Sequence, residues 1–173
     1  EFVPVDSEHF SIWYALKNNL ITKLSEVHIT ASGGSLLNIP KKKFNSLGKT
    51  QILKHPNWKM GRKITIDSST LMNKVFEIIE AKKIFNLNYN QLNIIIHPKS
   101  YIHAILKFSN GMIKIIAHDT TMEIPIFNSI YLNTNKSIKT KKIDFNKLNY
   151  LNFKKVDKVK FPIVKILKIL PNN

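Results

Sequence analysis

The sequence predicts an α+β fold, with a mixed or antiparallel sheet, helices packed against it, and an extended basic connector after it. Two observations indicate the sheet and the helices. Short runs rich in β-branched residues, typical of strands, occur at 27–30, 64–66, 92–96, 101–108 and 112–117. Apolar residues at helical spacing occur at 10–20, from 71 onward, and at 123–132. A third observation sets the connector apart: residues 132–173 hold eleven Lys against two Asp.

The length of 173 residues allows one ordinary domain with an appendage, and a hydrophobic fraction of 43% can build its core. We expect residues 1–131 to form the domain and residues 132–173 to form the connector, which ends in a helix at 163–170. The chain begins with Glu1 rather than Met, in a segment that reads like the middle of a strand. We therefore interpret the sequence as a fragment of a longer protein.

Composition narrows the class of protein. Cys is absent, so a disulfide framework and a thiolate metal site are excluded. No apolar run approaches the length of a membrane span. The net charge of +16 suggests a nucleic-acid or membrane-surface protein as an alternative, but 26 of the 27 basic residues are Lys and only Arg62 can make bidentate contacts. Ile, Lys and Asn share A/T-rich codons and total 71 residues. We therefore favour Lys on solvated faces, with no nucleic acid and no membrane as partner.

The first stretch with chemical potential is Asp6-Ser7-Glu8, which follows an expected strand end at 3–5. Asp6 and Glu8 are two residues apart, so both carboxylates would project to one side of an extended chain. A helix is predicted at 10–20, and the strand at 27–30 runs into Gly33-Gly34. Two glycines permit positive φ and close approach to a ligand, although alone they favour a plain turn.

A short helix is predicted at 50–54, and the aperiodic segment 55–63 that follows reads as a loop. This loop contains Trp58 and Met60, residues that normally seek a core. One interpretation is that Trp58 anchors the loop permanently. The other is a mobile lid whose apolar side chains cover a ligand for part of the time. The sequence leaves both open.

The second stretch follows a predicted strand at 64–66. Residues 67–70 offer capping groups to the next helix, and capping can be their whole role. On that helix Asn73, Lys74 and Glu77 lie near one another, because steps of three and four residues stack. Solvated carboxylates on a helix surface are the ordinary alternative for Glu77.

The last elements are better defined. The strands at 101–108 and 112–117 are joined by Ser109-Asn110-Gly111, and Asn-Gly between alternating segments is a strong hairpin signal. A helix at 123–132 begins around Pro125, at an early helix position.

Together the two stretches supply three carboxylates, which suit a hard divalent cation, and hydroxyl, amide and ammonium groups, which suit a phosphate. That combination is typical of an enzyme that handles a phosphorylated polyol through a metal. The ordered motifs resemble the 1-deoxy-D-xylulose 5-phosphate reductoisomerase family, NADPH-dependent enzymes of the non-mevalonate isoprenoid pathway. The motifs are Val5-Asp6-Ser7-Glu8-His9, Ala31-Ser32-Gly33-Gly34, 55–63, 67–77, Ile96-His97-Pro98, Ser100-Tyr101-Ile102-His103, and Met122 with Pro125-Ile126.

The resemblance implies a role for each matching residue. The metal ligands for Mg²⁺ or Mn²⁺ are Asp6, Glu8 and Glu77. The catalytic residues are Glu8, Glu77 and His55. The substrate-binding residues are Ser7, Glu8, Ser32, His55, Ser68, Asn73, Lys74 and Glu77. Of these, the residues that hold the phosphate are Ser32, Ser68, Asn73 and Lys74, with Ser68 expected at a helix start where the helix dipole would assist. The lid residues are Trp58 and Met60, and the residue on the nicotinamide side is Gly61.

By the same resemblance, residues 1–131 are the catalytic domain that binds metal and substrate. The family's N-terminal NADPH domain and C-terminal helical domain are not in this sequence, and no glycine-rich dinucleotide motif follows a strand. The implied reaction converts 1-deoxy-D-xylulose 5-phosphate to 2-C-methyl-D-erythritol 4-phosphate by rearrangement and then reduction with NADPH. We expect a homodimer in the bacterial cytoplasm, or in a plastid-type organelle if a targeting segment lies upstream. The fragment alone should be inactive.

Three departures from the family pattern support an alternative. Val75 stands where the family usually has Gly, Ser35-Leu36 replaces Pro-Phe, and Lys99 replaces a neutral polar residue. A β-branched side chain beside Asn73 and Lys74 would change the pocket's shape. The alternative is therefore a degenerate, non-catalytic remnant of the enzyme.

Overall fold

A five-stranded mixed sheet forms the centre of the computed structural model, which describes residues 2–17 and 23–171. Its strand order is β4-β3-β1-β2-β5, with β1 and β2 parallel and the other pairs antiparallel. The strands are β1 (Leu24–Ala31), β2 (Leu92–Ile96), β3 (Ile102–Phe108), β4 (Ile113–Ala117) and β5 (Lys154–Lys155). The predicted α+β class with a mixed sheet is confirmed.

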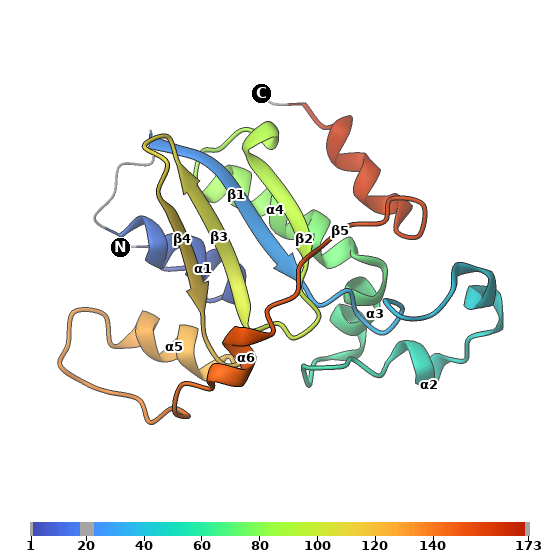
Figure 1. Ribbon diagram of the computed structural model, residues 1–173, viewed down its shortest axis with the longest axis horizontal. Helices are drawn as coiled ribbons and strands as arrows, with labels where there is room; N and C mark the ends of the chain where they lie inside the picture. The colour runs from blue at the N-terminus through green and yellow to red at the C-terminus, as the bar shows by residue number, and fades with distance from the viewer. Residues whose placement is uncertain (1, 18–22, 172–173) are drawn as a thin grey trace.

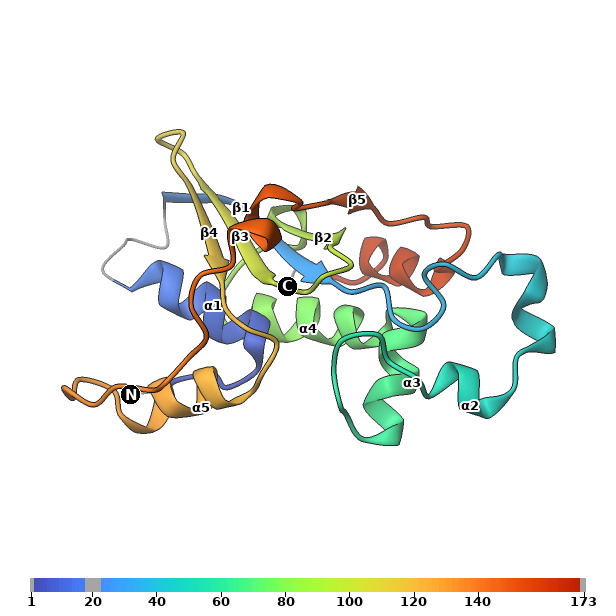
Figure 2. The same ribbon diagram turned by 60° about the horizontal axis from the view of Figure 1, so that its bottom comes forward.

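Helices cover one face of this sheet, where α1 and α4 lie side by side (Figures 1 and 2). The α-helices are α1 (Ser7–Leu16), α2 (Lys49–Ile52), α3 (Arg62–Thr70), α4 (Met72–Ile84), α5 (Glu123–Ile130) and α6 (Phe145–Asn149). The 3-10 helices are η2 (Lys41–Ser46), η3 (Tyr89–Gln91) and η4 (Pro162–Lys168). None of the helices in the described ranges is long and apolar enough to cross a membrane.

The core has two parts. One lies between α1, α4 and the sheet, where Ile12, Val27 and Ile78 are almost completely buried. The other lies at the N-terminal end of α4, where Val75 packs in a cluster that also contains Phe161. Val75 is therefore a core residue, and its side chain fills space that a glycine would leave empty.

Two predicted strands are wrong, and one predicted helix has different bounds. Residues 3–5 form no strand, and the helix predicted at 10–20 begins earlier, at Ser7, and ends at Leu16; residues 18–20 lie outside the described ranges. Residues 64–66 lie inside α3, because Gly61 starts a helix that runs to Thr70. The left-handed backbone of Leu71, with φ of 65°, then separates α3 from α4.

The connector is more structured than predicted. Its β5 pairs with β2 at the sheet edge, and its Phe161 and Val164 join the second part of the core. The final helix is the 3-10 helix η4 rather than an α-helix at 163–170. Apolar side chains of the connector therefore complete the domain.

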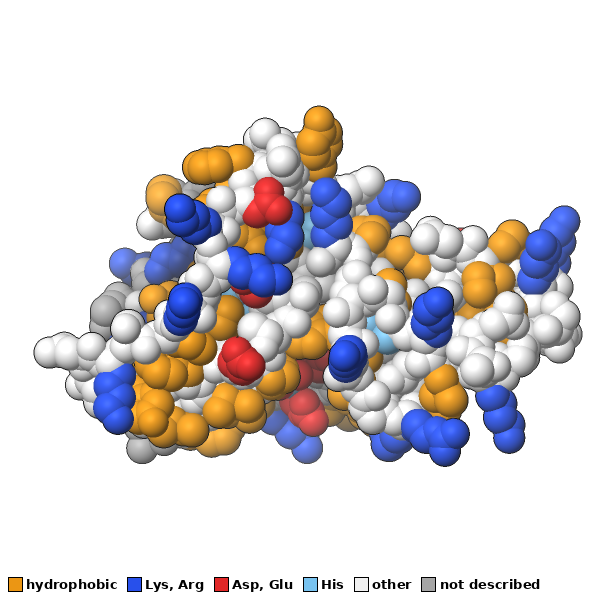
Figure 3. Space-filling view, turned by 90° about the horizontal axis from the view of Figure 1, so that it is seen from below, with side chains coloured by type: hydrophobic (Ala, Val, Ile, Leu, Met, Phe, Trp, Pro, Cys, Tyr) orange, Lys and Arg blue, Asp and Glu red, His pale blue; other side chains and the backbone are white. Residues whose placement is uncertain are grey.

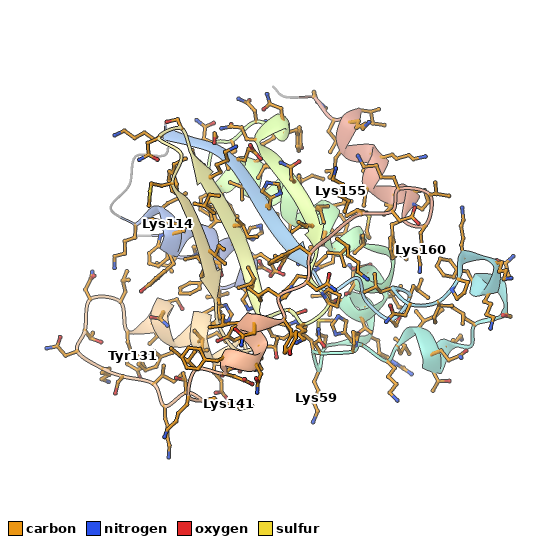
Figure 4. The ribbon with its side chains drawn as sticks, viewed as in Figure 1. Lys59, Lys114, Tyr131, Lys141, Lys155 and Lys160 are labelled. Carbon is orange, nitrogen blue, oxygen red and sulfur yellow. The ribbon has the colours of Figure 1, made fainter. Side chains whose placement is uncertain are left out.

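Lysines are spread over the molecule. Figure 4 shows Lys114, Lys155 and Lys160 on different elements, with Lys59 and Lys141 at the lower edge. Lys114 donates to the carbonyl of Ala15 and Lys160 to that of Leu37, so these two ammonium groups support the fold locally.

Candidate metal and phosphate site

A cavity of about 270 Å³ opens where β1 ends, between the first turn of α1, the N-terminal half of α4 and the loop after α2. The predicted site residues that line it are Asp6, Ser7, Glu8, Ser32, His55, Trp58, Met60, Ser68, Asn73, Lys74 and Glu77. Acidic side chains lie near the middle of the lower face, with hydrophobic side chains and lysines around them (Figure 3). Of the predicted site residues, only Gly61 is not among the cavity's lining; it lies in a shallower hollow on the same loop.

Three carboxylates converge in this cavity. Asp6, Glu8 and Glu77 each offer an oxygen within 4.8 Å of the other two. Their approach does not come from an extended chain, as the sequence suggested. Asp6 is the N-cap of α1, and its Oδ1 accepts hydrogen bonds from the backbone N–H groups of Glu8 and His9, both at 3.1 Å. The cap places Glu8 in the first turn of α1, opposite Glu77 on α4.

Lys74 joins the carboxylates. Its Nζ donates to Oε1 of Glu8 and, at 2.8 Å, to Oε2 of Glu77. Asn73 donates from Nδ2 to the other oxygen of Glu77 at 2.5 Å, and Ser7 donates to Glu8 at the same distance. Glu77 and Lys74 are only 3% and 8% exposed, so these charged groups interact in a medium of low dielectric constant.

The charges of this cluster are unbalanced, since one ammonium faces three carboxylates. Burial raises the pKa of Glu77 well above its usual value, and repulsion from Glu8 raises it further. Burial acts in the same direction on Glu8, but the Lys74 ammonium, the neighbouring His103 and the hydrogen bond from Ser7 together outweigh it and lower the pKa of Glu8 to about 2. Burial would lower the pKa of Lys74, but Glu77 and Glu8 outweigh that effect and raise it. An added cation would relieve this excess of negative charge.

His9 joins the two helices that carry the carboxylates. It is 2% exposed, and its Nε2 lies 2.9 Å from the carbonyl oxygen of Glu77. Its Nδ1 lies 3.4 Å from Asp6 and 3.8 Å from Glu80. The sequence placed His9 in a motif but gave it no role, because only the fold brings α1 against α4.

The residues expected to hold a phosphate surround the same cavity. Ser32 Oγ accepts from the N–H of Gly34 at 3.0 Å and contacts His55 Nε2 at 2.9 Å. Ser68 does not begin a helix, as predicted; it lies in the last turn of α3, because the predicted strand before it is helical. The helix dipole of α3 therefore does not act as expected at Ser68.

Two glycines allow the loop after β1 to pack closely against α3. Gly33 and Gly34 both have positive φ, at 85° and 61°. A Cβ on Gly34 would lie 2.5 Å from the carbonyl oxygen of Ser68 and 2.7 Å from Cα of Ser69. The close approach is thus to the backbone of α3, and it brings Ser68 beside Ser32 in the cavity wall.

The loop after α2 forms the other wall through His55, Trp58 and Met60, which are all half-buried. The N–H groups of Asn57 and Trp58 donate to Nδ1 of His55 at 3.1 and 2.9 Å. An acceptor at Nδ1 places the proton on Nε2, which donates to Ser32. Burial, with a contribution from the Lys74 charge, lowers the pKa of His55 and keeps it neutral.

Other residues of the cavity carried no predicted role. Thr30, Lys59, Ile64, Ser100 and Met122 also line it. Asn57 secures the loop by donating to the carbonyl of Pro98 at 2.6 Å and to Ser100 Oγ at 2.9 Å. A larger hollow of about 460 Å³ lies between β2 and η4, but no carboxylate lines it.

An α+β domain with a buried carboxylate cluster and phosphate-type donors in one cavity is a candidate metal-dependent catalytic domain. Residues 2–85 match the sequence model of the 1-deoxy-D-xylulose 5-phosphate reductoisomerase C-terminal domain. Proteins named 1-deoxy-D-xylulose 5-phosphate reductoisomerase are 63% identical in Pelagibacter ubique, over 99% of this chain, and 39% identical in Sulfurihydrogenibium sp., over 96%. The chain spans 44% of the length of each.

Solved structures give the same result. A DOX-P reductoisomerase in complex with NADPH, fosmidomycin and magnesium superposes with a TM-score of 0.87 at 31% identity, over 96% of this chain and 43% of that one. The Zymomonas mobilis enzyme in complex with NADPH gives 0.84 at 29% identity, over 95% of this chain and 42% of that one. The chain is therefore similar to 1-deoxy-D-xylulose 5-phosphate reductoisomerases over almost its whole length, and its residues 2–85 match the family's C-terminal domain.

Proposed function

We propose that this chain is the metal- and substrate-binding part of an enzyme that converts 1-deoxy-D-xylulose 5-phosphate to 2-C-methyl-D-erythritol 4-phosphate with NADPH. The observation that carries the proposal is the convergence of Asp6, Glu8 and Glu77 in a cavity that Lys74 and Ser32 share. The relatives that carry this name, one of them solved with NADPH and magnesium, support it.

The donor set fits a divalent cation. All three candidate ligands are carboxylates that already lie within 4.8 Å of one another, and their charge is only partly neutralised by Lys74. Oxygen donors select Mg²⁺ or Mn²⁺ over softer metals. We assign Asp6, Glu8 and Glu77 as the residues that would hold this ion. When bound, such an ion supplies Lewis-acid polarisation and a template for the substrate's oxygens.

Lys74 changes partner in this proposal. It neutralises Glu8 and Glu77, which are also candidate metal ligands. With Glu8 and Glu77 holding a cation, the Lys74 ammonium would be left to donate to the substrate phosphate. Asn73 donates to Glu77 in the same way and can follow Lys74.

Ser32 is already oriented for a phosphate. A hydroxyl has one donor and two acceptor sites. Both acceptor sites of Ser32 Oγ are used, by the N–H of Gly34 and by Nε2–H of His55. Its own hydrogen is therefore available to an anion. With Ser68 in the same wall, we assign these residues to the phosphate, and Ser7 to the rest of the substrate.

Trp58 and Met60 give the cavity its apolar cover, which would exclude water from the substrate. Gly61, at the start of α3, is exposed, and a Cβ there would meet nothing within 4 Å. That open space leaves room for the nicotinamide of NADPH, whose remaining contacts we assign to chain outside this sequence.

The burial of Val75 favours the active enzyme over a degenerate remnant. Its side chain is 1% exposed in the second part of the core and is not among the residues that line the cavity. A β-branched residue at this position therefore changes core packing and leaves the lining unchanged.

We also propose a homodimer in the cytoplasm. The homodimer is supported by the edge strand β4, whose side chains of Ile113 and Ile115 are 56% and 51% exposed. Sedimentation of the complete protein would test the dimer.

Calorimetric titration of the 173-residue chain with Mn²⁺ tests the metal site directly. We expect saturable binding that Glu8→Gln and Glu77→Gln each abolish, while Glu26→Gln on β1 leaves it unchanged. Turnover of the complete protein with NADPH then tests the reaction. Binding that survives both substitutions would exclude the proposed metal site, and binding without turnover would favour the remnant.

A further inference from the structure

Four rings form a continuous column behind the cavity. Trp58 of the loop meets His103 edge-on, with ring centres 6.2 Å apart and planes at 69°. His103 stacks on His118 at 3.7 Å with planes 14° apart. His118 meets Phe10 of α1 edge-on at 6.4 Å and 68°. The column thus runs from the loop that covers the cavity to the helix that carries Glu8.

The two imidazoles at its centre are held rigidly. His103 is 1% exposed and His118 is 9% exposed, on neighbouring strand β3 and at the end of β4. His103 Nε2 lies 3.2 Å from the carbonyl oxygen of His118, and His118 Nδ1 lies 2.8 Å from that of Asp119. Both nitrogens therefore donate, and each ring can stay neutral with its flat face against the other.

The stacked histidines support the loop through its Trp58 side chain. Within the described ranges, the side chain of Asn57 makes the loop's hydrogen bonds to Pro98 and Ser100, and Trp58 adds the ring contact to His103. His118 stacks flat against the ring of His103 and so helps to hold the ring that Trp58 contacts. The end of β4 lies beside α1 in both ribbon views (Figures 1 and 2).

We propose that His118 is a positioning residue: through His103 it sets the place of Trp58 and so couples closure of the loop to the helix that carries Glu8. This inference rests on the proposed function, in which Trp58 covers the substrate. This role depends on the flat shape of the His118 ring and not on its protonation. The proposed role needs no proton transfer, and His118 Nε2 is buried without a hydrogen-bond partner among the described residues.

Hydrogen exchange of the complete protein tests the coupling, with and without fosmidomycin and Mg²⁺. In the unaltered protein these ligands should slow exchange over residues 55–61. His118→Leu removes the flat ring at similar volume. It should abolish most of this slowing and weaken fosmidomycin binding by a factor of about 3 to 10, the size of one lost ring–ring contact. Exchange in β1 and α4 should stay unchanged, which a general loss of stability would not allow.

Two controls define the role. His118→Phe keeps a flat ring, removes both ring nitrogens, including the one that donates to Asp119, and should still behave like the unaltered protein if the flat ring is what matters. Phe153→Leu breaks the other imidazole stack, in which His97 and Phe153 lie 4.9 Å apart, and should not affect the loop. If His118→Leu fails to fold, His118→Met replaces it, because its flexible side chain fills the space without a flat face.

The outcomes separate the two proposals. Normal slowing in the Leu or Met variant, or a Phe variant that behaves like Leu, would overturn the role of His118 alone. Failure of the unaltered protein to bind fosmidomycin with Mg²⁺ would overturn the proposed function and, with it, this inference.

Discussion

The two walls of the cavity are built on different principles. The helical wall, formed by Asp6, Glu8, Lys74 and Glu77, joins two helices that are buried against the sheet, and Lys74 pairs with two of its three carboxylates. The loop wall, residues 53–61, contains no helix or strand, and its large side chains are half-buried. The comparison indicates that the chemical wall is fixed by two packed helices, whereas the covering wall depends on the few side-chain contacts of a loop.

The largest effect should come from the helical wall. Glu77→Gln removes a proposed metal ligand but keeps the shape of the side chain. We expect turnover of the complete protein to fall by about a thousandfold or more, since Lewis-acid stabilisation is worth several kcal/mol. Steady-state kinetics at saturating Mn²⁺ measures this loss. Glu80→Gln, on the exposed side of the same helix, is the matched control and should leave turnover nearly unchanged. Equal losses in both variants would mean that Glu77 acts through the helix and not through a metal.

Lys74→Met should separate the stability of the helical wall from its chemistry. Removal of the ammonium leaves buried carboxylates without a partner, and we expect a loss of about 3 kcal/mol or more in the free energy of unfolding. Mg²⁺ should restore much of it, because the ion replaces the lost charge. Urea unfolding with and without Mg²⁺ measures both effects.

The control for that experiment is Lys63→Met. Lys63 pairs with Asp67, but its side chain is 83% exposed, so its loss should cost less than about 1 kcal/mol. If Mg²⁺ does not change the stability of the Lys74 variant, the result would argue against Glu8 and Glu77 being partners of both Lys74 and the metal.

His103 lies between the two walls and predicts a pH effect. Burial, together with the neighbouring His118, lowers the pKa of His103 to about 4, below the unfolded value of about 6.5. The unfolded chain therefore binds more protons between these values, and stability should fall as pH drops from 6.5 to 4, by about 3 kcal/mol in total. Unfolding curves across this range measure the slope, and His103→Gln should remove this contribution. A slope that persists in His103→Gln would assign the effect to other groups.

The smallest effect distinguishes the two tryptophans. Trp58→Ala should weaken substrate binding by about tenfold but change the free energy of unfolding little, because a half-buried loop residue adds little to the core. Trp13→Ala should do the reverse, since Trp13 packs against the first part of the core. Fosmidomycin binding and urea unfolding of both variants make the comparison. A large loss of stability in Trp58→Ala would show the permanent anchor that the sequence also allowed.

Much of the fold could be predicted from local patterns. The hairpin at Asn110-Gly111 and the strand at 92–96 are where the sequence placed them, because alternation and turn chemistry act between neighbours. The error at 64–66 has a physical cause. Three residues of Ile-Thr-Ile favour a strand locally, but α3 forms because it packs against α4.

The candidate site also has features that the sequence predicted and features that only the fold determined. Composition indicated its chemistry, since oxygen donors without cysteine favour a hard cation over a soft one. Spacing placed Asn73, Lys74 and Glu77 on one helix, α4. Only the tertiary structure decided which groups meet. Glu8 and Lys74 are 66 residues apart, and His103 meets Trp58 across β3 and the loop. Such contacts depend on the packing of α1, α4 and the sheet into one core, which no local pattern in the chain encodes.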